Sequence, residues 1–176
     1  MMRKQTNRFS DLVHYVCEIA RDKRFGAVKL NKMLWYIDTL SYKKWGASIS
    51  GETAYIKRQH GPVGKTTMKT LAELEKKGVL SVRRRHESVG VEYTSLAELK
   101  PNPFTDDERE LIRSVVEDIC DNHTANSISE RSHTGIWEVA MIGEEIPLCA
   151  VLVDDDGEIK NKHKKWADKA IAALSQ

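Results

Sequence analysis

Apolar residues recur along this chain mainly at the three- and four-residue spacing of helices that bury one face. The clearest stripe covers residues 28–45, where the apolar positions are Leu30, Met33, Leu34, Ile37, Leu40 and Trp45. The same segment is rich in large aromatic side chains, so it commits much apolar area to a core or to a partner. Gly46 follows directly and is suited to end a helix. The pattern predicts a long central helix.

Similar stripes predict further helices. They cover residues 9–24, 65–77, 105–119, 124–131 and 164–174. The helix at 105 has the clearest start signal, because Thr105 and Glu108 form a capping box. The helix at 65 is expected to bury Met68 and Leu71, and Gly78 is expected to cap its end in the left-handed conformation. Most of the chain is therefore expected to be helical.

Alternating apolar and polar positions predict a few short strands. Residues 53–57 form one strand, and residues 79–85 and 89–94 form a β-hairpin. Residues 148–153 have the pattern of a buried strand. Gly61 and Pro62 are expected to form a turn that continues neither neighbouring element.

These elements predict a mainly α fold with a few short β-strands, of the α+β class. The expected architecture is a single compact helical domain with a β-hairpin, which spans residues 1–176 and has its core at about 10–150. A basic C-terminal helix is expected at 159–176. A length of 176 residues with 40% hydrophobic content is typical of one domain.

No stretch of the sequence suits a membrane span or a secretion signal. No run approaches the roughly 18 apolar residues that cross a bilayer, and the N-terminal residues lack an apolar stretch. We therefore expect a cytoplasmic protein without membrane contact. Three cysteines, Cys17, Cys120 and Cys149, leave an odd number without a CxxC pair, so reduced thiols are expected.

Charge is distributed unevenly, although the net charge is only +2. Residues 1–97 hold 19 lysines and arginines against 9 aspartates and glutamates, whereas residues 98–158 hold 4 against 16. Two interpretations stay open. The two parts can neutralise each other across an internal interface, or they can present a basic face to nucleic acid and an acidic face to a basic partner.

Motifs that would carry chemistry are weak. Gly64, Lys65 and Thr66 match the end of a phosphate-binding P-loop, but the first glycine of that template is missing. His14 and Cys17 share a helical face, which favours core packing over a zinc site. No local pattern nominates a nucleophile with its base. We therefore expect no catalytic residue, no metal, no cofactor and no enzymatic activity.

Several short motifs carry a resemblance to a known family. In chain order they are Lys29-Leu30-Asn31-Lys32-Met33-Leu34 with Asp38, Ser48-Ile49-Ser50-Gly51, His60-Gly61-Pro62-Val63, Ile128-Ser129 with Ser132-His133 and Trp137, and Gly143-Glu144-Glu145-Ile146-Pro147. With these motifs in this order the chain resembles the Panacea domain, the SocA-like antitoxin family often found in prophages. The resemblance covers roughly residues 10–150.

The resemblance implies an antitoxin that neutralises a co-encoded toxin by direct protein–protein binding. The partner would be a cognate toxin encoded by an adjacent gene, and the chain could also act as an adaptor that delivers the toxin to a protease. No chemistry of its own is required. Residues expected at the interface are aromatic side chains of the central helix and residues around the Gly-Pro-Val segment: Tyr36, Tyr42, Trp45, Lys57, Arg58, His60 and Pro62.

An alternative function is DNA binding by a transcriptional regulator. A helix at 65–77 followed by a basic hairpin has the outline of a winged helix-turn-helix. The phosphate contacts would come from Lys65, Lys69, Arg83, Arg84 and Arg85. The acidic second half argues against this function, because DNA would repel it. A weak DNA contact beside toxin binding, an enzyme with a pocket of perturbed ionisable groups, and a phage-associated interaction module also stay open.

Overall fold

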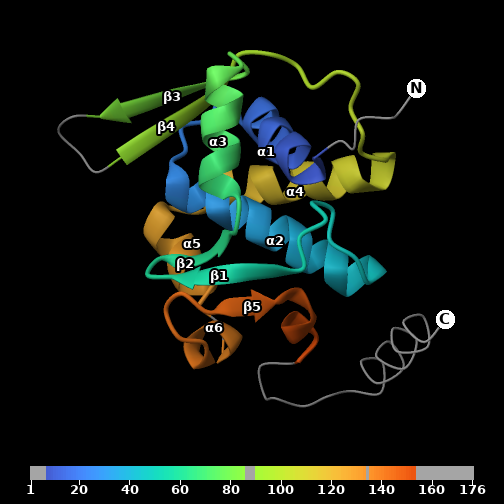
Figure 1. Cartoon of the computed structure of the whole chain (residues 1–176), viewed down its shortest axis with the longest axis vertical. Coiled ribbons are helices and arrows are strands. Elements are labelled where there is room, and N and C mark those ends of the chain that lie inside the picture. Colours follow the sequence, from blue (N-terminus) through green and yellow to red (C-terminus); the bar gives the residue numbers. More distant parts are fainter. Residues whose placement is uncertain (1–6, 86–89, 134, 154–176) are drawn as a thin grey trace.

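The computed structural model describes residues 7–85, 90–133 and 135–153 (Figure 1). Its helices are α1 (Arg8–Ile19), α2 (Ala27–Trp45), α3 (Thr67–Lys76), α4 (Asp106–Asn122), α5 (Ala125–Arg131) and α6 (Gly135–Val139), with a 3₁₀ helix η1 (Leu148–Leu152). Its strands are β1 (Ala54–Arg58), β2 (Gly61–Gly64), β3 (Leu80–Arg85), β4 (Gly90–Ser95) and β5 (Glu145–Pro147). The helix expected at 159–176 lies outside the described residues.

Helix α2 lies at the centre of the fold, in contact with α1, α4, α5, β2 and η1 (Figure 1). Its stripe residues Leu30, Met33, Leu34 and Ile37 are fully buried, as the periodicity predicts. The helix ends at Gly46, whose φ of 76° is the left-handed cap conformation. The predicted central helix is therefore confirmed.

Local capping signals located the starts of α4 and α5 correctly. The Thr105 hydroxyl accepts a hydrogen bond from the Glu108 amide, and the Glu108 carboxylate accepts one from the Thr105 amide at 2.9 Å. Thr124 and Ser127 make the same exchange at the start of α5. Both boxes satisfy amide groups that a helix start leaves unpaired.

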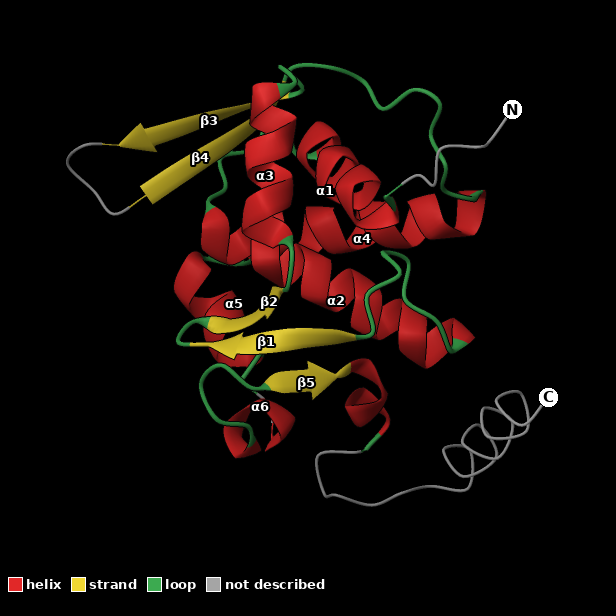
Figure 2. Cartoon of the chain, in the orientation of Figure 1, coloured by secondary structure: helices red, strands yellow, loops and turns green. Residues whose placement is uncertain are grey.

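Strands β2, β1 and β5 form an antiparallel sheet with β1 in the middle (Figure 2). The expectation that Gly61 and Pro62 form a turn is wrong, because both lie in β2 and Pro62 pairs with Lys57. Proline is tolerated there because β2 is an edge strand, where a missing N–H costs no hydrogen bond to a neighbour. The turn is made by the two residues between the strands, Gln59 and His60.

Other expectations are wrong where distant contacts decide the conformation. Leu148–Leu152 forms η1 rather than a strand, and the strand β5 comes just before it and pairs with β1. Helix α1 ends at Ile19 rather than at residue 24. Leu40, which the stripe placed on the buried face of α2, is exposed, whereas its neighbours Thr39 and Ser41 are buried.

Helix α3 buries a different stripe from the one expected. Met68 is 75% exposed. The buried positions are Thr67, Thr70, Leu71 and Leu74, so threonines take the places next to the two leucines. The expected inward position of Met68 is therefore wrong.

Strands β3 and β4 form the predicted hairpin, from Leu80 opposite Ser95 to Arg85 opposite Gly90. The hairpin extends from the body beside α3 and α1 (Figure 1). Mainly helical structure with two small sheets confirms the predicted α+β class. Within the described residues, no helix combines the length and apolarity that a membrane crossing requires.

Candidate functional site

Three motif-bearing segments that are far apart in the sequence meet at one point. The Lys32 ammonium of α2 donates a hydrogen bond to the His60 carbonyl in the β1–β2 turn. The Ser129 hydroxyl of α5 donates to the same carbonyl at 3.1 Å, and the Ser132 hydroxyl donates to the Ser129 carbonyl at 2.7 Å. We call the group Lys32, His60, Gly61, Ser129 and Ser132 the motif junction.

Gly61 is required by the packing of this junction. Its φ of +114° lies in a region that side-chain-bearing residues rarely adopt. A Cβ atom at this position would lie 1.6 Å from the Lys32 Nζ and 3.0 Å from the Ser132 Oγ. Any other residue at this position would therefore overlap with the buried Lys32 ammonium.

Trp137 of α6 contacts two other groups beside the junction. Its indole stacks on the His133 imidazole, with ring centroids 3.6 Å apart and planes 5° from parallel. The Lys57 ammonium of β1 lies 3.9 Å from the indole centroid and donates to the Ala140 carbonyl at 2.8 Å. These contacts attach α6 and the residues after it to the small sheet.

Lys32 and Lys57 are both buried, and neither pairs with a carboxylate among the described residues. Burial lowers the pKa of Lys32 to about 8. Burial, followed by the nearby charges of Lys32 and Lys57, also lowers the pKa of His133. We call Lys32, Lys57, His133 and Trp137 the cationic cluster.

A second buried network joins two more motif segments. The Asp38 carboxylate of α2 accepts hydrogen bonds from the Ser50 amide at 2.9 Å and the Tyr55 hydroxyl at 2.7 Å, and also from the Ser50 hydroxyl. Burial raises the pKa of Asp38 to about 6, and the donors from Ser50 and Tyr55 oppose that rise. The network fastens the loop between α2 and β1 to the middle of α2.

The surface next to the junction is partly apolar. Val139, the last residue of α6, and Met141 and Ile142, which follow it before β5, are large exposed hydrophobic residues. Backbone hydrogen bonds from Gly143 N to Lys57 O (2.9 Å) and from Lys57 N to Glu144 O (2.8 Å) hold this segment against β1.

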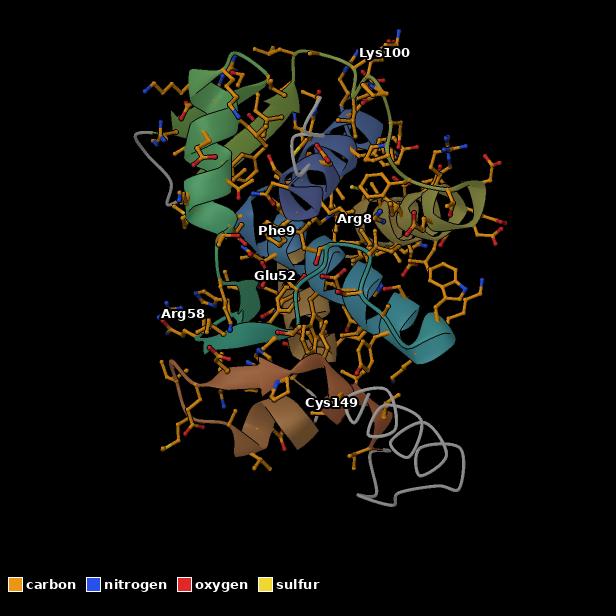
Figure 3. All side chains as sticks on the ribbon, turned by 45° about the vertical axis from the view of Figure 1, so that its right-hand side comes forward. Arg8, Phe9, Glu52, Arg58, Lys100 and Cys149 are labelled. Atoms are coloured by element: carbon orange, nitrogen blue, oxygen red, sulfur yellow. The ribbon has the colours of Figure 1, made fainter. Side chains whose placement is uncertain are left out.

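Arg58 is exposed at the outer end of β1 (Figure 3). His60 is exposed in the β1–β2 turn that follows. We call Arg58, His60, Val139, Met141 and Ile142 the junction surface. It combines two polar side chains with three exposed apolar ones, and backbone hydrogen bonds to Lys57 hold the residues just after the apolar ones against β1.

The residues expected at a toxin interface divide into two groups. Arg58 and His60 belong to the junction surface, whereas the side chains of Lys57 and Pro62 are buried. Tyr36 is half-buried, with the Arg131 guanidinium 6.0 Å from its ring centroid.

Tyr42 and Trp45 lie toward the other end of α2. Tyr42 is half-buried, and exposed Trp45 lines a cleft of about 240 Å³ with Asp107 and Glu108. Tyr36 and Trp45 are nine residue steps apart, which is roughly 14 Å along the helix. Tyr36 and Trp45 therefore lie at well-separated points of α2, beside different neighbours.

The arginines expected to contact DNA lie on opposite faces of the hairpin. Arg84 points toward α3, where its guanidinium lies 3.4 Å from the Glu75 carboxylate. Arg83 lines a cleft of about 240 Å³ together with Arg21 and Arg24. The side chain of Arg85 is not among those described. The alternation of side chains along a strand explains the separation.

The lysines expected to contact DNA are engaged in ion pairs. Lys65 lies 2.7 Å from the Glu145 carboxylate, and Lys69 lies 4.0 Å from that of Glu73. Lys65 follows β2 directly, so the Gly-Lys-Thr sequence runs from a strand into α3.

The expected core positions of His14 and Cys17 are observed. Both are buried, and the His14 Nε2 lies 3.0 Å from the Ala97 carbonyl. Cys17, Cys120 and Cys149 are free thiols. No three side chains of the metal-binding types come together within the part of the chain that the structure describes.

This α+β domain has a central helix tied to a small sheet by a buried lysine, and a short helix held beside that sheet by an aromatic stack and a second buried lysine. The family model described as "Antitoxin SocA-like, Panacea domain" matches residues 30–138. Since the match covers more than half of the chain, the chain belongs to this family. The match includes Lys32, His60 and His133, but residues 143–147 lie outside it. No curated protein and no solved structure matched the chain.

Proposed function

We propose that this chain is an antitoxin that neutralises a toxin encoded by an adjacent gene through direct binding. Membership of the SocA-like antitoxin family is the observation that carries the proposal. Binding alone can block a toxin, so the proposal requires no catalytic step and no cofactor from this chain.

The junction surface is the best candidate for the contact. Exposed apolar side chains that lie together mark protein-binding sites more often than scattered ones do. Val139, Met141 and Ile142 lie together in one short segment, and Arg58 provides the residue type that often anchors an interface. Because α6 and β5 hold this segment at both ends, little ordering is needed on binding.

Co-expression tests the proposal. The full chain is produced together with the protein encoded by the neighbouring gene, and growth and co-purification are scored. We expect the neighbour alone to arrest growth, and the pair to grow and to purify as a complex. A toxic neighbour that this chain neither binds nor neutralises would contradict the antitoxin function.

Delivery of the toxin to a protease is one consequence that binding could have. The half-life of the toxin in cells distinguishes this mode from simple occlusion. Delivery predicts a shorter half-life when the chain is present, whereas occlusion predicts an unchanged or longer one.

A secondary DNA contact is favoured by one observation, the cleft lined by Arg21, Arg24 and Arg83. Asp22 and Glu92 line it too, so its positive charge is partly balanced. Binding to the promoter of its own operon should then weaken with added salt and with Arg24→Glu. If neither added salt nor Arg24→Glu weakens binding to the promoter, this cleft is not the DNA contact.

A further inference from the structure

The cationic cluster holds more positive charge than the described residues around it neutralise. Lys32 is 1% exposed, and its ammonium has one hydrogen-bond acceptor among them, the His60 carbonyl. Lys57 is 7% exposed and has carbonyl acceptors and an indole face, but again no carboxylate. A buried ammonium without a counter-charge is costly. The folded chain would therefore gain stability from an anion at this point.

Two further polar atoms of the cluster are unused. His133 Nε2 and Trp137 Nε1 are inaccessible to solvent and have no hydrogen-bond partner among the described residues. An indole N–H can only donate, and a histidine nitrogen donates when it carries the proton. Buried polar groups without a partner are rare in folded proteins. One bound oxyanion would neutralise the ammonium charge and would also accept hydrogen bonds from the two unused N–H groups.

We propose that the cationic cluster is a receptor site for one oxyanion, and that a carboxylate of the bound toxin occupies it in the complex. This inference rests on the proposed function and specifies the chemistry of the partner. Lys32 supplies the charge, and His133 and Trp137 supply N–H donors. The Lys57 ammonium lies over the indole ring, 3.9 Å from its centroid. A carboxylate suits such a site because it accepts several hydrogen bonds and pairs with an ammonium.

The cluster lies next to groups that reach solvent. His60, whose carbonyl accepts from Lys32, is exposed, and His133 is half-buried. The acids that act on His133 are Glu130 and Glu138, and both are exposed to water, which screens them. An acidic side chain that docks beside Arg58 would meet the positive charge of its guanidinium before it reaches Lys32.

A purely structural link is the competing explanation, because Lys32 also ties α2 to the β1–β2 turn. Lys32→Met distinguishes the two, since it removes the charge and keeps most of the volume. The His60 carbonyl keeps its hydrogen bond from Ser129. A structural link predicts a lower Tm. A receptor site predicts an unchanged or higher Tm without anions, because an unpaired buried charge has been removed.

The first test uses inorganic phosphate on the isolated full chain. The Tm is measured at rising phosphate concentration and constant ionic strength for the wild type, Lys32→Met and Lys29→Met. Lys29 is a matched control, because it lies on the same helix and also donates to a backbone carbonyl, that of Cys120 at 3.1 Å.

Ligands that bind only the folded state raise its Tm until the site is full. We expect a saturating rise for the wild type and Lys29→Met, and its loss in Lys32→Met. Equal responses of all three chains would indicate general exclusion of phosphate from the surface, and would overturn the site. A Tm of Lys32→Met that is lower than that of the wild type but rises equally with phosphate would also overturn the site, because it would show that Lys32 acts only as a structural link.

His133→Phe keeps the test decisive if Lys32→Met fails to fold. Phenylalanine preserves a ring that can stack on Trp137 and removes the nitrogen donors. We expect this variant to fold and to respond less to phosphate than the wild type. An undiminished response would remove His133 from the site and overturn the proposal as stated.

The second test uses the complex with the product of the adjacent gene. Lys32→Met is expected to weaken the complex roughly tenfold or more, the effect of losing one charge-assisted contact, whereas Lys29→Met should have no effect. Unchanged affinity of Lys32→Met would overturn the proposal and leave the antitoxin function intact. Failure of the wild type to bind would instead contradict the antitoxin function and, with it, the assignment of a toxin carboxylate.

Discussion

At Asp38 the fold buries a carboxyl group that would be ionised in water at neutral pH. Burial raises its pKa from 3.8 to about 6. The folded chain therefore binds this proton more tightly than the unfolded chain does. The stability that protonation of Asp38 contributes is fully present below its unfolded pKa, and it is lost as the pH rises to about 6.

Asp38→Asn should remove this pH dependence. We expect the free energy of unfolding of the wild type to fall relative to the variant by roughly 2 kcal/mol between pH 4 and pH 7. Urea unfolding of both chains across this range measures the difference, and contributions from other titrating groups cancel in it. Parallel pH profiles would show that Asp38 ionises normally in the folded state.

Gly61→Ala should be more destabilising than an ordinary substitution at a glycine with positive φ. Gly78 is the matched control, because its φ of +70° is also positive but a Cβ atom added there would have no neighbour within 4 Å. We expect Gly78→Ala to cost about 1 kcal/mol, and Gly61→Ala at least twice as much because of the clash with Lys32. Chemical denaturation measures both costs.

A double variant tests the cause of that cost. Lys32→Ala combined with Gly61→Ala should recover part of the loss, because the shorter side chain vacates the space that the new Cβ needs. If the two effects simply add, backbone strain explains the whole cost and the clash does not.

Elements with local signals could be predicted, and elements that depend on distant contacts could not. Hydrogen bonds within four residues define the capping boxes of α4 and α5. Strand β5 has three residues and exists because β1 offers it a partner. Pro62 indicated a turn because the sequence did not show that β2 would be an edge strand.

The segment from α6 to β5 should be the element most sensitive to Lys57. Its ammonium binds the Ala140 carbonyl just after α6 and contacts the face of Trp137. Lys57→Met is expected to speed amide hydrogen exchange in residues 135–147 while exchange in α1 and α4 stays unchanged. Lys43→Met, an exposed change on α2, is the control. Uniformly faster exchange would mean that Lys57 supports the whole fold rather than this segment.

Across the whole molecule, part of the uneven charge is neutralised internally. Arg8 pairs with Glu108 at 2.7 Å, Lys65 pairs with Glu145 at 2.7 Å, and Lys23 pairs with Asp121. Each pair joins the basic first part of the chain to the acidic second part. These contacts support the interpretation in which the two parts meet across an internal interface.

The candidate site could be predicted only in part. Arg58 and His60 were expected because they flank the Gly-Pro-Val segment, and both are exposed. The burial of Lys57 could not be anticipated, because it depends on α6 folding back onto β1. The stacking of His133 on Trp137 joins two nearby motif residues, but sequence spacing alone does not reveal a ring contact.

The apolar part of the junction surface allows a prediction for the whole complex. Ile142→Glu is expected to weaken binding of the adjacent gene product at least tenfold, because a buried carboxylate replaces an apolar contact. Leu96→Glu is the matched control, since Leu96 is 60% exposed and Ile142 is 63% exposed. Leu96 follows β4 on the hairpin, on a different element from the junction surface.

Comparing Ile142→Glu with Leu96→Glu shows which surface binds the partner, separately from whether the complex forms at all. Both substitutions place a charge at a position that already reaches water, so both chains should keep the Tm of the wild type within a few degrees. Loss of binding in Ile142→Glu alone would locate the interface at the junction surface. Equal binding by both variants would move the interface elsewhere, and Trp45 with the acidic cleft beside it would be the next surface to change.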